Sequence, residues 1–288
     1  MANLKEIRNR ISSVTSTKQI TSAMKMVSAA KLRKSQTAIV QLRPYSYQME
    51  EVVCRLIEDN TEDIPCMKKR RTENKILLVA LTSNKGLCSV FNSSIIKLTK
   101  KRIEEYKEKN KEIFLQSFGK KGDSVFKHIE NINYLGSQDE IWEQMSFEKI
   151  ALFTEGILKQ YNKGDYDKIE IIYNRFKNAA LQEPVIEDFL SFDSVKRDVS
   201  TINNDYIFEP NKTEILQSVV PLFLNTKMYG CFLDSFTSEH GARMSSMNKA
   251  TDNAQTLLGD LTLTYNKLRQ ASITNEIIEI CSGANALS

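Results

Sequence analysis

The stretch LKEIRNRISSVTSTKQITSAMKMV, residues 4–27, contains the pattern that decides the fold. Its first apolar residues are three, four and three positions apart, the spacing of a coiled-coil seam: Leu4, Ile7, Ile11 and Val14. Residues 3–58 contain no glycine and a single proline, Pro44. One helix of about 50 residues is predicted, roughly 75–80 Å long. A helix of that length must project from any small globular core.

A second seam of the same spacing follows Met244, and it predicts that the two terminal helices pair antiparallel. Both seams then turn polar for about one heptad, at Lys18 and Thr21 in the first helix and at Ser272 and Asn275 in the second. Aligning these polar positions sets Thr21 opposite Ser272 and Lys18 opposite Asn275, so that paired residue numbers add up to 293. The same register brings Met24 level with Arg269.

Beyond the polar positions the apolar stripe is predicted to shift to neighbouring residues: Ile20, Met24 and Val27 in the first helix, and Ile273, Ile277 and Ile280 in the second. Leaving a seam polar costs stability in a coiled coil. The polar layer therefore indicates either a level that adapts to other subunits or a device that specifies register, and the spacing does not separate the two.

The middle of the chain alternates strands with helices, which predicts a small α/β domain with a mostly parallel sheet. Strands are expected at residues 75–81, 112–117, 132–135 and 168–176, helices at 90–109 and 147–161, and a turn with a short helix at 119–128. Residues 182–192 contain Pro184, which suits an edge strand. The predicted organisation is an N-terminal coiled-coil helix over 1–58, the α/β domain over 73–206 and a C-terminal coiled-coil helix over 209–288.

Composition narrows the possible function classes. Ten glycines and five prolines in 288 residues favour long elements over a turn-rich β fold. Five cysteines without a C-x-x-C pair and only two histidines argue against a disulfide framework and against a zinc site. The longest apolar run, residues 76–81, is too short to span a membrane.

Charge is unevenly distributed along the chain. Residues 1–45 hold nine lysines and arginines against one acid, a net +8 within a chain of net +4. Such asymmetry predicts an acidic partner for this helix. The segment's composition also matches a mitochondrial transit peptide, but a seam beginning at Leu4 and the length of the helix favour mature sequence.

Three further motifs contain residue types that can carry chemistry. The turn at residues 82–88 follows a strand and precedes a helix, yet it lacks the glycines of a phosphate loop, so nucleotide binding is not expected. The pair Glu239 and His240 is interpreted as solvated or facing a partner, not as a catalytic base. Trp142 is expected to pack in the core or on the domain surface.

Several segments resemble the γ subunits of F-type, rotary ATP synthases of the bacterial type. Near the N-terminus these are KEIR at 5–8, ITSAMKMV at 20–27 and RPY at 43–45, with NKGLC at 84–88 in the middle. Near the C-terminus they are ATDNA at 250–254, YNKLRQASIT at 265–274 and SGA at 282–284. The sequence SVFN at 89–92 departs from the family's usual Gly-Gly-Leu-Asn.

The resemblance implies a rotor shaft: an antiparallel coiled coil with an inserted Rossmann-like α/β domain, no catalytic residue and no cofactor. The expected partners are the α and β subunits of a catalytic hexamer, the ε subunit and the membrane ring of c subunits, with no nucleic acid. By motif match, the residues expected to face the hexamer are Met24, Lys25, Arg269, Gln270 and Thr274. The expected location is peripheral, at the cytoplasmic face of a bacterial inner membrane.

Two rival functions remain open from the residues alone. A free α/β nucleotide-binding protein would bind nucleotide by itself. A coiled-coil nucleic-acid protein would bind DNA through residues 1–45 with steep salt dependence, although that segment has no aromatic residue before Tyr45 on which bases could stack.

Overall fold

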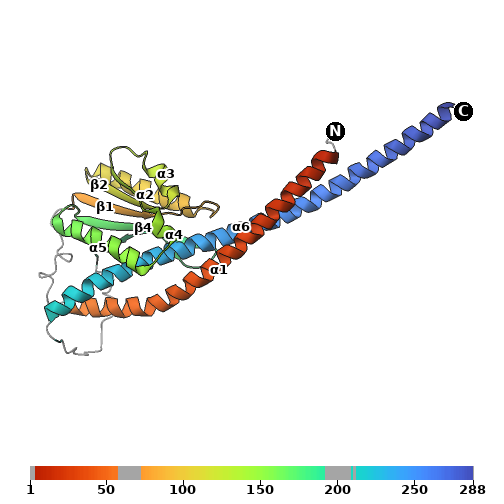
Figure 1. Ribbon diagram of the computed structural model, residues 1–288. Coiled ribbons are helices and arrows are strands. Elements are labelled where there is room, and N and C mark those ends of the chain that lie inside the picture. The colour runs from red at the N-terminus through yellow and green to blue at the C-terminus, as the bar shows by residue number, and fades with distance from the viewer. Residues whose placement is uncertain (1–3, 58–72, 192–208, 210–211, 288) are drawn as a thin grey trace. The chain divides into compact units, whose positions relative to one another are not determined.

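The computed structural model describes residues 4–57, 73–191, 209 and 212–287. Two very long helices, α1 (Leu4–Ile57) and α6 (Lys212–Leu287), stand at the two ends of the chain (Figure 1). The strands between them are β1 (Lys75–Leu81), β2 (Glu112–Phe118), β3 (Asn133–Ser137), β4 (Lys168–Phe176) and β5 (Gln182–Asp188). The intervening helices are α2 (Phe91–Glu108), α3 (Lys120–Phe126), α4 (Asp139–Glu143) and α5 (Phe147–Lys163).

The chain forms two compact units. The first comprises Met1–Ala29 and Arg243–Ser288, and the second comprises Ala30–Ala242. The first unit is therefore built from the beginning of α1 and the end of α6 alone. The second contains the rest of both helices together with the sheet.

The sheet of the second unit has the strand order β3-β2-β1-β4-β5. The first four strands are parallel, and β5 runs antiparallel to β4 at the edge. This is the Rossmann-like order. Strands β2 and β3 are added on one side of β1, and the chain then crosses to the other side of β1 to form β4 and β5. The expected edge strand is confirmed, and Pro184 lies opposite Asn174 of β4, where its missing N–H costs the sheet little.

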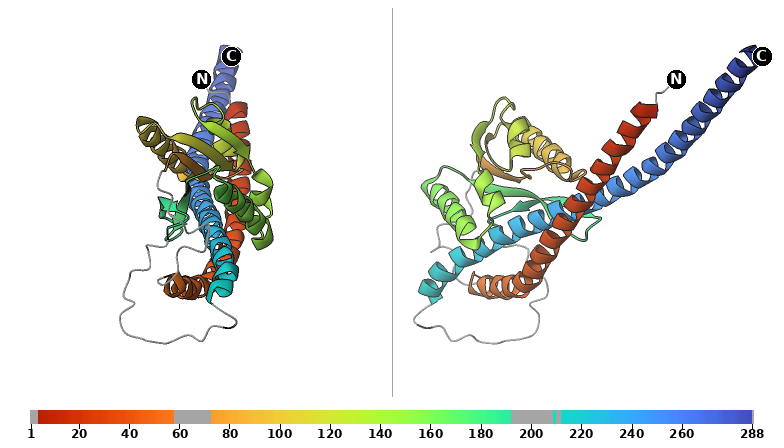
Figure 2. Two further views of the ribbon diagram at one scale, coloured as in Figure 1. Left: turned by 90° about the vertical axis from the view of Figure 1, so that its left-hand side faces the viewer. Right: turned by 45° about the vertical axis from the view of Figure 1, so that its right-hand side comes forward.

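Helices cover both faces of the sheet, and alternate side chains of β1 serve the two faces (Figures 1 and 2). Leu77 and its i+2 neighbours pack with buried residues of α5 and α6, such as Ile150 and Phe232. Ile76 and its i+2 neighbours pack with α2 and α3 through Ile95 and Phe126. This double cover explains why β1 is an unbroken apolar run.

Glu170 lies in the middle of apolar β4 and is only 2% exposed. It accepts two hydrogen bonds from the Arg102 guanidinium of α2, at 2.8 and 2.6 Å, and one from the Tyr106 hydroxyl at 2.6 Å. Lys168 Nζ lies 3.3 Å from the same carboxylate. Burial acts to raise the pKa of Glu170, but the hydrogen bonds from Arg102 and Tyr106 outweigh it and hold that pKa below its ordinary value. The network joins α2 to the sheet.

The ends of β1 and β2 meet at Gly119, which has φ +87°. The Thr82 hydroxyl donates to the carbonyls of Phe118 and Gly119, at 2.7 and 3.1 Å. The backbone N–H of Gly122 donates to the same hydroxyl oxygen at 2.9 Å. Because Thr82 and Ser83 are fully buried here, the turn that follows β1 begins inside the core.

Asp234 of α6 is largely buried, and Nη2 of Arg43 in α1 lies 3.8 Å from its carboxylate. Burial raises the pKa of Asp234 to about 6, although Arg43 and Arg175 act to lower it. The folded protein therefore binds this proton more tightly than the unfolded chain does. Between about pH 4 and 6 the contribution of Asp234 to stability falls as the pH rises.

We expect Asp234→Asn to change the free energy of unfolding, relative to the unsubstituted chain, more favourably at pH 7.5 than at pH 4.5. The expected difference between the two pH values is about 1–3 kcal/mol. Urea unfolding at both pH values, compared with the unsubstituted chain, measures this difference. If Asp234→Asn, compared with the unsubstituted chain, were instead less stable at pH 7.5 than at pH 4.5, Arg43 and Arg175 would outweigh burial.

The predicted elements of the middle segment are confirmed within a few residues, and α4 is an additional helix that the sequence pattern does not predict. Pro44 lies inside α1 and does not end it, as expected. Residues 192–206 of the predicted domain lie outside the described residues. None of the helices within the described ranges is long and apolar enough to cross a membrane.

Candidate functional site

The candidate site is the surface of the first unit, the antiparallel helical pair made by residues 4–29 of α1 and 243–287 of α6. Two side-chain contacts fix its register. Thr251 Oγ1 donates to Thr21 Oγ1 at 2.9 Å, and Lys18 Nζ donates to Gln255 Oε1. Thr21 in turn donates to the carbonyl of Lys18 at 3.0 Å.

These contacts show that the predicted register is wrong. Thr21 lies opposite Thr251 and not opposite Ser272, which is a further 21 residues along α6, or about 31 Å at the rise of a helix. Lys18 and Thr21 therefore do not share a layer with Ser272 and Asn275. Met24 and Arg269 are likewise at different levels of the pair.

The predicted shift of the apolar stripe is also wrong, because the heptad of α1 continues unbroken. Ile20 and Val27 are 60% and 59% exposed, whereas Ser28 on the original seam is 3% exposed. The seam of α6 is confirmed at Met247 and Ala254, which are 4% and 8% exposed. A small residue such as Ser28 lets two helices approach closely, so it keeps a seam position without being apolar.

The end of α6 extends beyond the beginning of α1 (Figures 1 and 2). In the observed register Leu4, the first described residue of α1, lies near the level of Leu268. Every residue from 273 to 285 is exposed, including Ile273, Ile277 and Ile280, at 48%, 55% and 71%. A single helix that displays isoleucines on its surface has the character of an interaction surface.

The five residues expected to contact other subunits fall into two groups. Met24 and Lys25 lie on α1, three and four residues from Thr21, and both are half-buried. Arg269, Gln270 and Thr274 lie on the exposed end of α6, where Thr274 Oγ1 donates to the carbonyl of Gln270 at 2.9 Å. The structure does not bring the two groups together.

The remaining sequence candidates lie in the second unit. Trp142 is buried, as expected, and its Nε1 donates to Glu239 Oε2 at 2.6 Å. The interpretation of Glu239 and His240 as solvated is wrong, since they are 4% and 5% exposed. His240 packs edge-on against Phe236, with ring centroids 4.4 Å apart. The hydrogen bond from Trp142 to Glu239 joins α4 to α6.

Two features of the described residues are not predicted from the sequence pattern. One is the Arg102–Glu170 network, signalled by a lone carboxylate within the apolar strand Lys168–Phe176. The other is a pocket beside α5, whose lining residues come from six separate parts of the chain. Within the ranges described, the structure contains no cluster of three or more histidine, cysteine or acidic side chains that could hold a metal ion.

The fold and the site define a class of protein: a long antiparallel helical pair that carries an inserted Rossmann-like domain. Residues 3–287 match the family described as ATP synthase. The chain is 49% identical to the ATP synthase gamma chain of Flavobacterium johnsoniae, with 100% of both chains covered. It is 48% identical to that of Flavobacterium psychrophilum, over 100% of this chain and 99% of the relative. The chain therefore belongs to the gamma-chain family of ATP synthases.

Solved structures support the same fold. A chain of the Euglena gracilis mitochondrial ATP synthase, OSCP/F1/c-ring in rotational state 3, superposes with a TM-score of 0.67 at 22% identity, covering 99% of this chain and 94% of that one. A chain of the Tetrahymena thermophila mitochondrial ATP synthase central stalk/cring gives a TM-score of 0.57 at 24% identity, covering 80% and 99%.

Proposed function

We propose that this gamma chain is the rotor of the central stalk of an F-type ATP synthase. It couples ion-driven rotation of the membrane c ring to ATP synthesis or hydrolysis at the catalytic sites of the β subunits, and it holds no catalytic residue itself. The observation that carries this proposal is the match to gamma chains over the whole length, including both terminal helices. The Rossmann-like domain alone would support many functions.

In this role the helical pair stands inside a ring of alternating α and β subunits, and its asymmetry gives the three catalytic sites different affinities for nucleotide. The unpaired end of α6 supports that placement, because its exposed isoleucines need a surrounding surface. The net charge of +8 on residues 1–45 supports acidic surfaces on the partner.

The observed register divides the proposed contacts between two levels. Met24 and Lys25 meet the hexamer where the two helices are paired, and Arg269, Gln270 and Thr274 meet it where α6 is single. About 31 Å of helix separates the level of Thr21 from that of Ser272. The two groups therefore contact different parts of the hexamer.

The Rossmann-like domain is placed outside the hexamer, against the ε subunit and the c ring. The chain is then peripheral to the membrane, at the cytoplasmic face of a bacterial inner membrane, and it reaches that membrane only through the complex.

Photo-crosslinking tests the two levels of contact. Benzoylphenylalanine replaces Met24 in one variant and Thr274 in another, and each variant is assembled with α and β subunits and irradiated. We expect both to crosslink to the hexamer, and mass spectrometry is expected to find the two crosslinks in different segments of α or β. The same probe at Ser124, exposed on α3, is the matched control and should give no crosslink to the hexamer. Crosslinks from Met24 and Thr274 to one common segment would contradict the proposal.

A further inference from the structure

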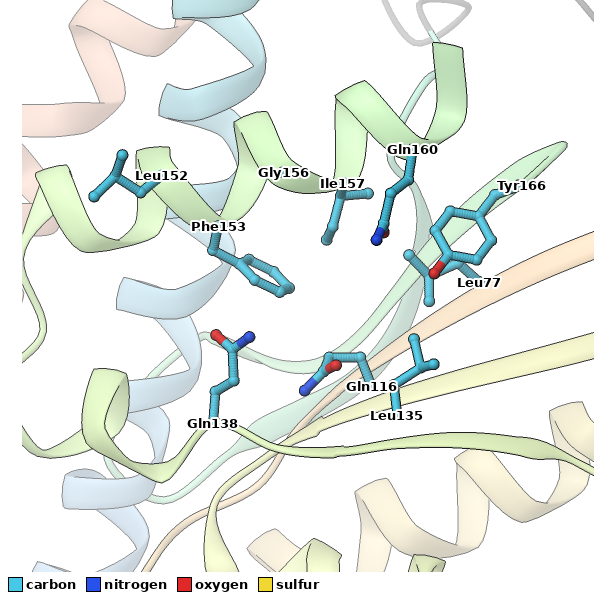
Figure 3. A pocket seen from close by; sticks show the side chains of 10 residues that line it. All are labelled: Leu77, Gln116, Leu135, Gln138, Leu152, Phe153, Gly156, Ile157, Gln160 and Tyr166. Carbon is cyan, nitrogen blue, oxygen red and sulfur yellow. The ribbon is translucent and has the colours of Figure 1, made fainter. Parts of the chain in front are cut away.

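A pocket of about 360 Å³ lies in the second unit between α5 and one face of the sheet (Figure 3). Phe153 and Ile157 line it from α5, and Leu77 lines it from β1. The volume falls in the range of small-molecule sites, about 300–1,000 Å³. Nothing in the proposed rotor role requires this space.

Four uncharged polar side chains line the pocket, and they come from separate elements: Gln116, Gln138, Gln160 and Tyr166. Tyr166 is 4% exposed, and its hydroxyl points into the pocket (Figure 3). Among the described residues this hydroxyl has no hydrogen-bond partner. The oxygen is not among the fully buried unpaired atoms of the described residues, so it is reachable from the pocket and free to bond a ligand there. A phenol with its ordinary pKa, about 10, is already a donor at neutral pH, and burial raises the pKa of Tyr166 further.

The glutamines complete a set of donors and acceptors. Gln116 is 8% exposed, and its Nε2 donates to the carbonyls of Gly136 and Ser117, at 3.1 and 3.3 Å. These bonds orient the side chain and occupy both of its donors, so it offers the pocket only an acceptor. Its Oε1 has no partner within the described part of the chain. Gln138 and Gln160 are exposed at the mouth of the pocket, and each of their side-chain amides offers one acceptor and two donors.

The chemistry of the lining selects the class of ligand. None of the ten lining residues carries a charge, so a phosphate or carboxylate would gain no ion pair on leaving water. Apolar side chains instead provide contact for a flat ring. The amides of Gln138 and Gln160 keep a donor and an acceptor, and glutamine amides of this kind pair in bidentate fashion with the edges of uncharged heterocycles. Gln116 adds a single acceptor.

Gly156 of α5 lines the pocket and has no side chain to occupy it. A Cβ at this position would have no other atom within 4 Å, so packing does not demand a glycine. Glycine in the interior of a helix is less favourable than alanine. The residue costs helix stability and leaves room in the pocket.

We infer that this pocket binds a flat, uncharged ligand with lactam or amide edges, held by the amides of Gln116, Gln138 and Gln160 and by the hydroxyl of Tyr166. The inference stands apart from the rotor role, because either can fail without the other.

Ligand-observed NMR on the full chain tests the inference with two uncharged lactam probes, lumichrome and theophylline. We expect at least one to bind saturably. The substitution Gly156→Leu should weaken that probe at least tenfold by filling the pocket, and Tyr166→Phe should weaken it several-fold by removing only the hydroxyl.

The matched control is Glu155→Leu, which adds the same side chain to the neighbouring exposed position of α5 and should leave binding unchanged. Circular dichroism must show that each variant is folded. Three results would overturn the inference: neither probe binds, binding is equal in Gly156→Leu, or naphthalene, which has no polar edge, binds as tightly as the lactams.

Discussion

Replacing Arg102 by methionine is expected to lower the free energy of unfolding by about 3–5 kcal/mol, the cost of breaking a buried ion pair by removing one partner. The Arg102 side chain is 23% exposed, but the Glu170 side chain it pairs with is only 2% exposed. Without the guanidinium, the Glu170 carboxylate keeps only the Tyr106 hydroxyl and the more distant Lys168. Urea unfolding at pH 7.5 measures the loss.

Two further variants separate this effect from a simple loss of packing. Glu105→Gln removes the other carboxylate that Arg102 contacts, whose side chain is 38% exposed, and should cost less than about 1 kcal/mol. The double variant Arg102→Met with Glu170→Met removes both charges and should recover much of the stability. A double variant as unstable as the sum of its two single variants would refute the explanation.

The substitution Gly119→Ala is expected to cost more than about 4 kcal/mol, the exceptional end of single substitutions. Gly119 combines φ +87° with no space for a side chain. An added Cβ would lie 2.3 Å from the Thr82 carbonyl oxygen and 2.8 Å from the Ser83 carbonyl carbon. Both neighbours are backbone atoms, so relief requires the ends of β1 and β2 to separate.

Gly136→Ala is the matched control for Gly119→Ala. Gly136 has φ +97°, but a Cβ there would have nothing within 4 Å. Its substitution adds backbone strain alone and should cost about 1–3 kcal/mol. Thermal unfolding of the two variants measures the difference. Equal losses would mean that strain, and not the contact with Thr82, sets the cost at Gly119.

Local pattern was enough to predict the α/β elements. Each strand and each long helix of the middle segment occupies a contiguous stretch, so its own hydrophobic period specifies it. The edge position of β5 also followed from one residue, Pro184. Element α4 has only five residues, too few for a helical period to emerge.

The register of the terminal helices was not predictable in the same way. Matching polar positions assumes that polar residues of one helix face those of the other. In the structure the α1 seam instead runs through Ser28, and the end of α6 that contains Ser272 extends past Leu4. Pairing is decided by burial along the whole length of the shared seam. A polar stretch at the free end of the longer helix contributes nothing to it.

The pocket and the Glu239 contact depend on residues far apart in the sequence. Glu239 is 97 positions from its partner Trp142, so a pattern within α6 could not show that its carboxylate is buried. Tyr166 and Gln116 likewise come together only through the packing of α5 on the sheet. Such sites follow from tertiary structure and leave no local signal.

The most direct test of the rotor proposal is reconstitution of the full chain with purified α and β subunits, followed by size-exclusion chromatography and an ATP hydrolysis assay. The predicted result is a complex with one copy of this chain per hexamer and hydrolysis that depends on the chain. A folded chain that does not associate with the hexamer, or associates without changing hydrolysis, would contradict the proposal.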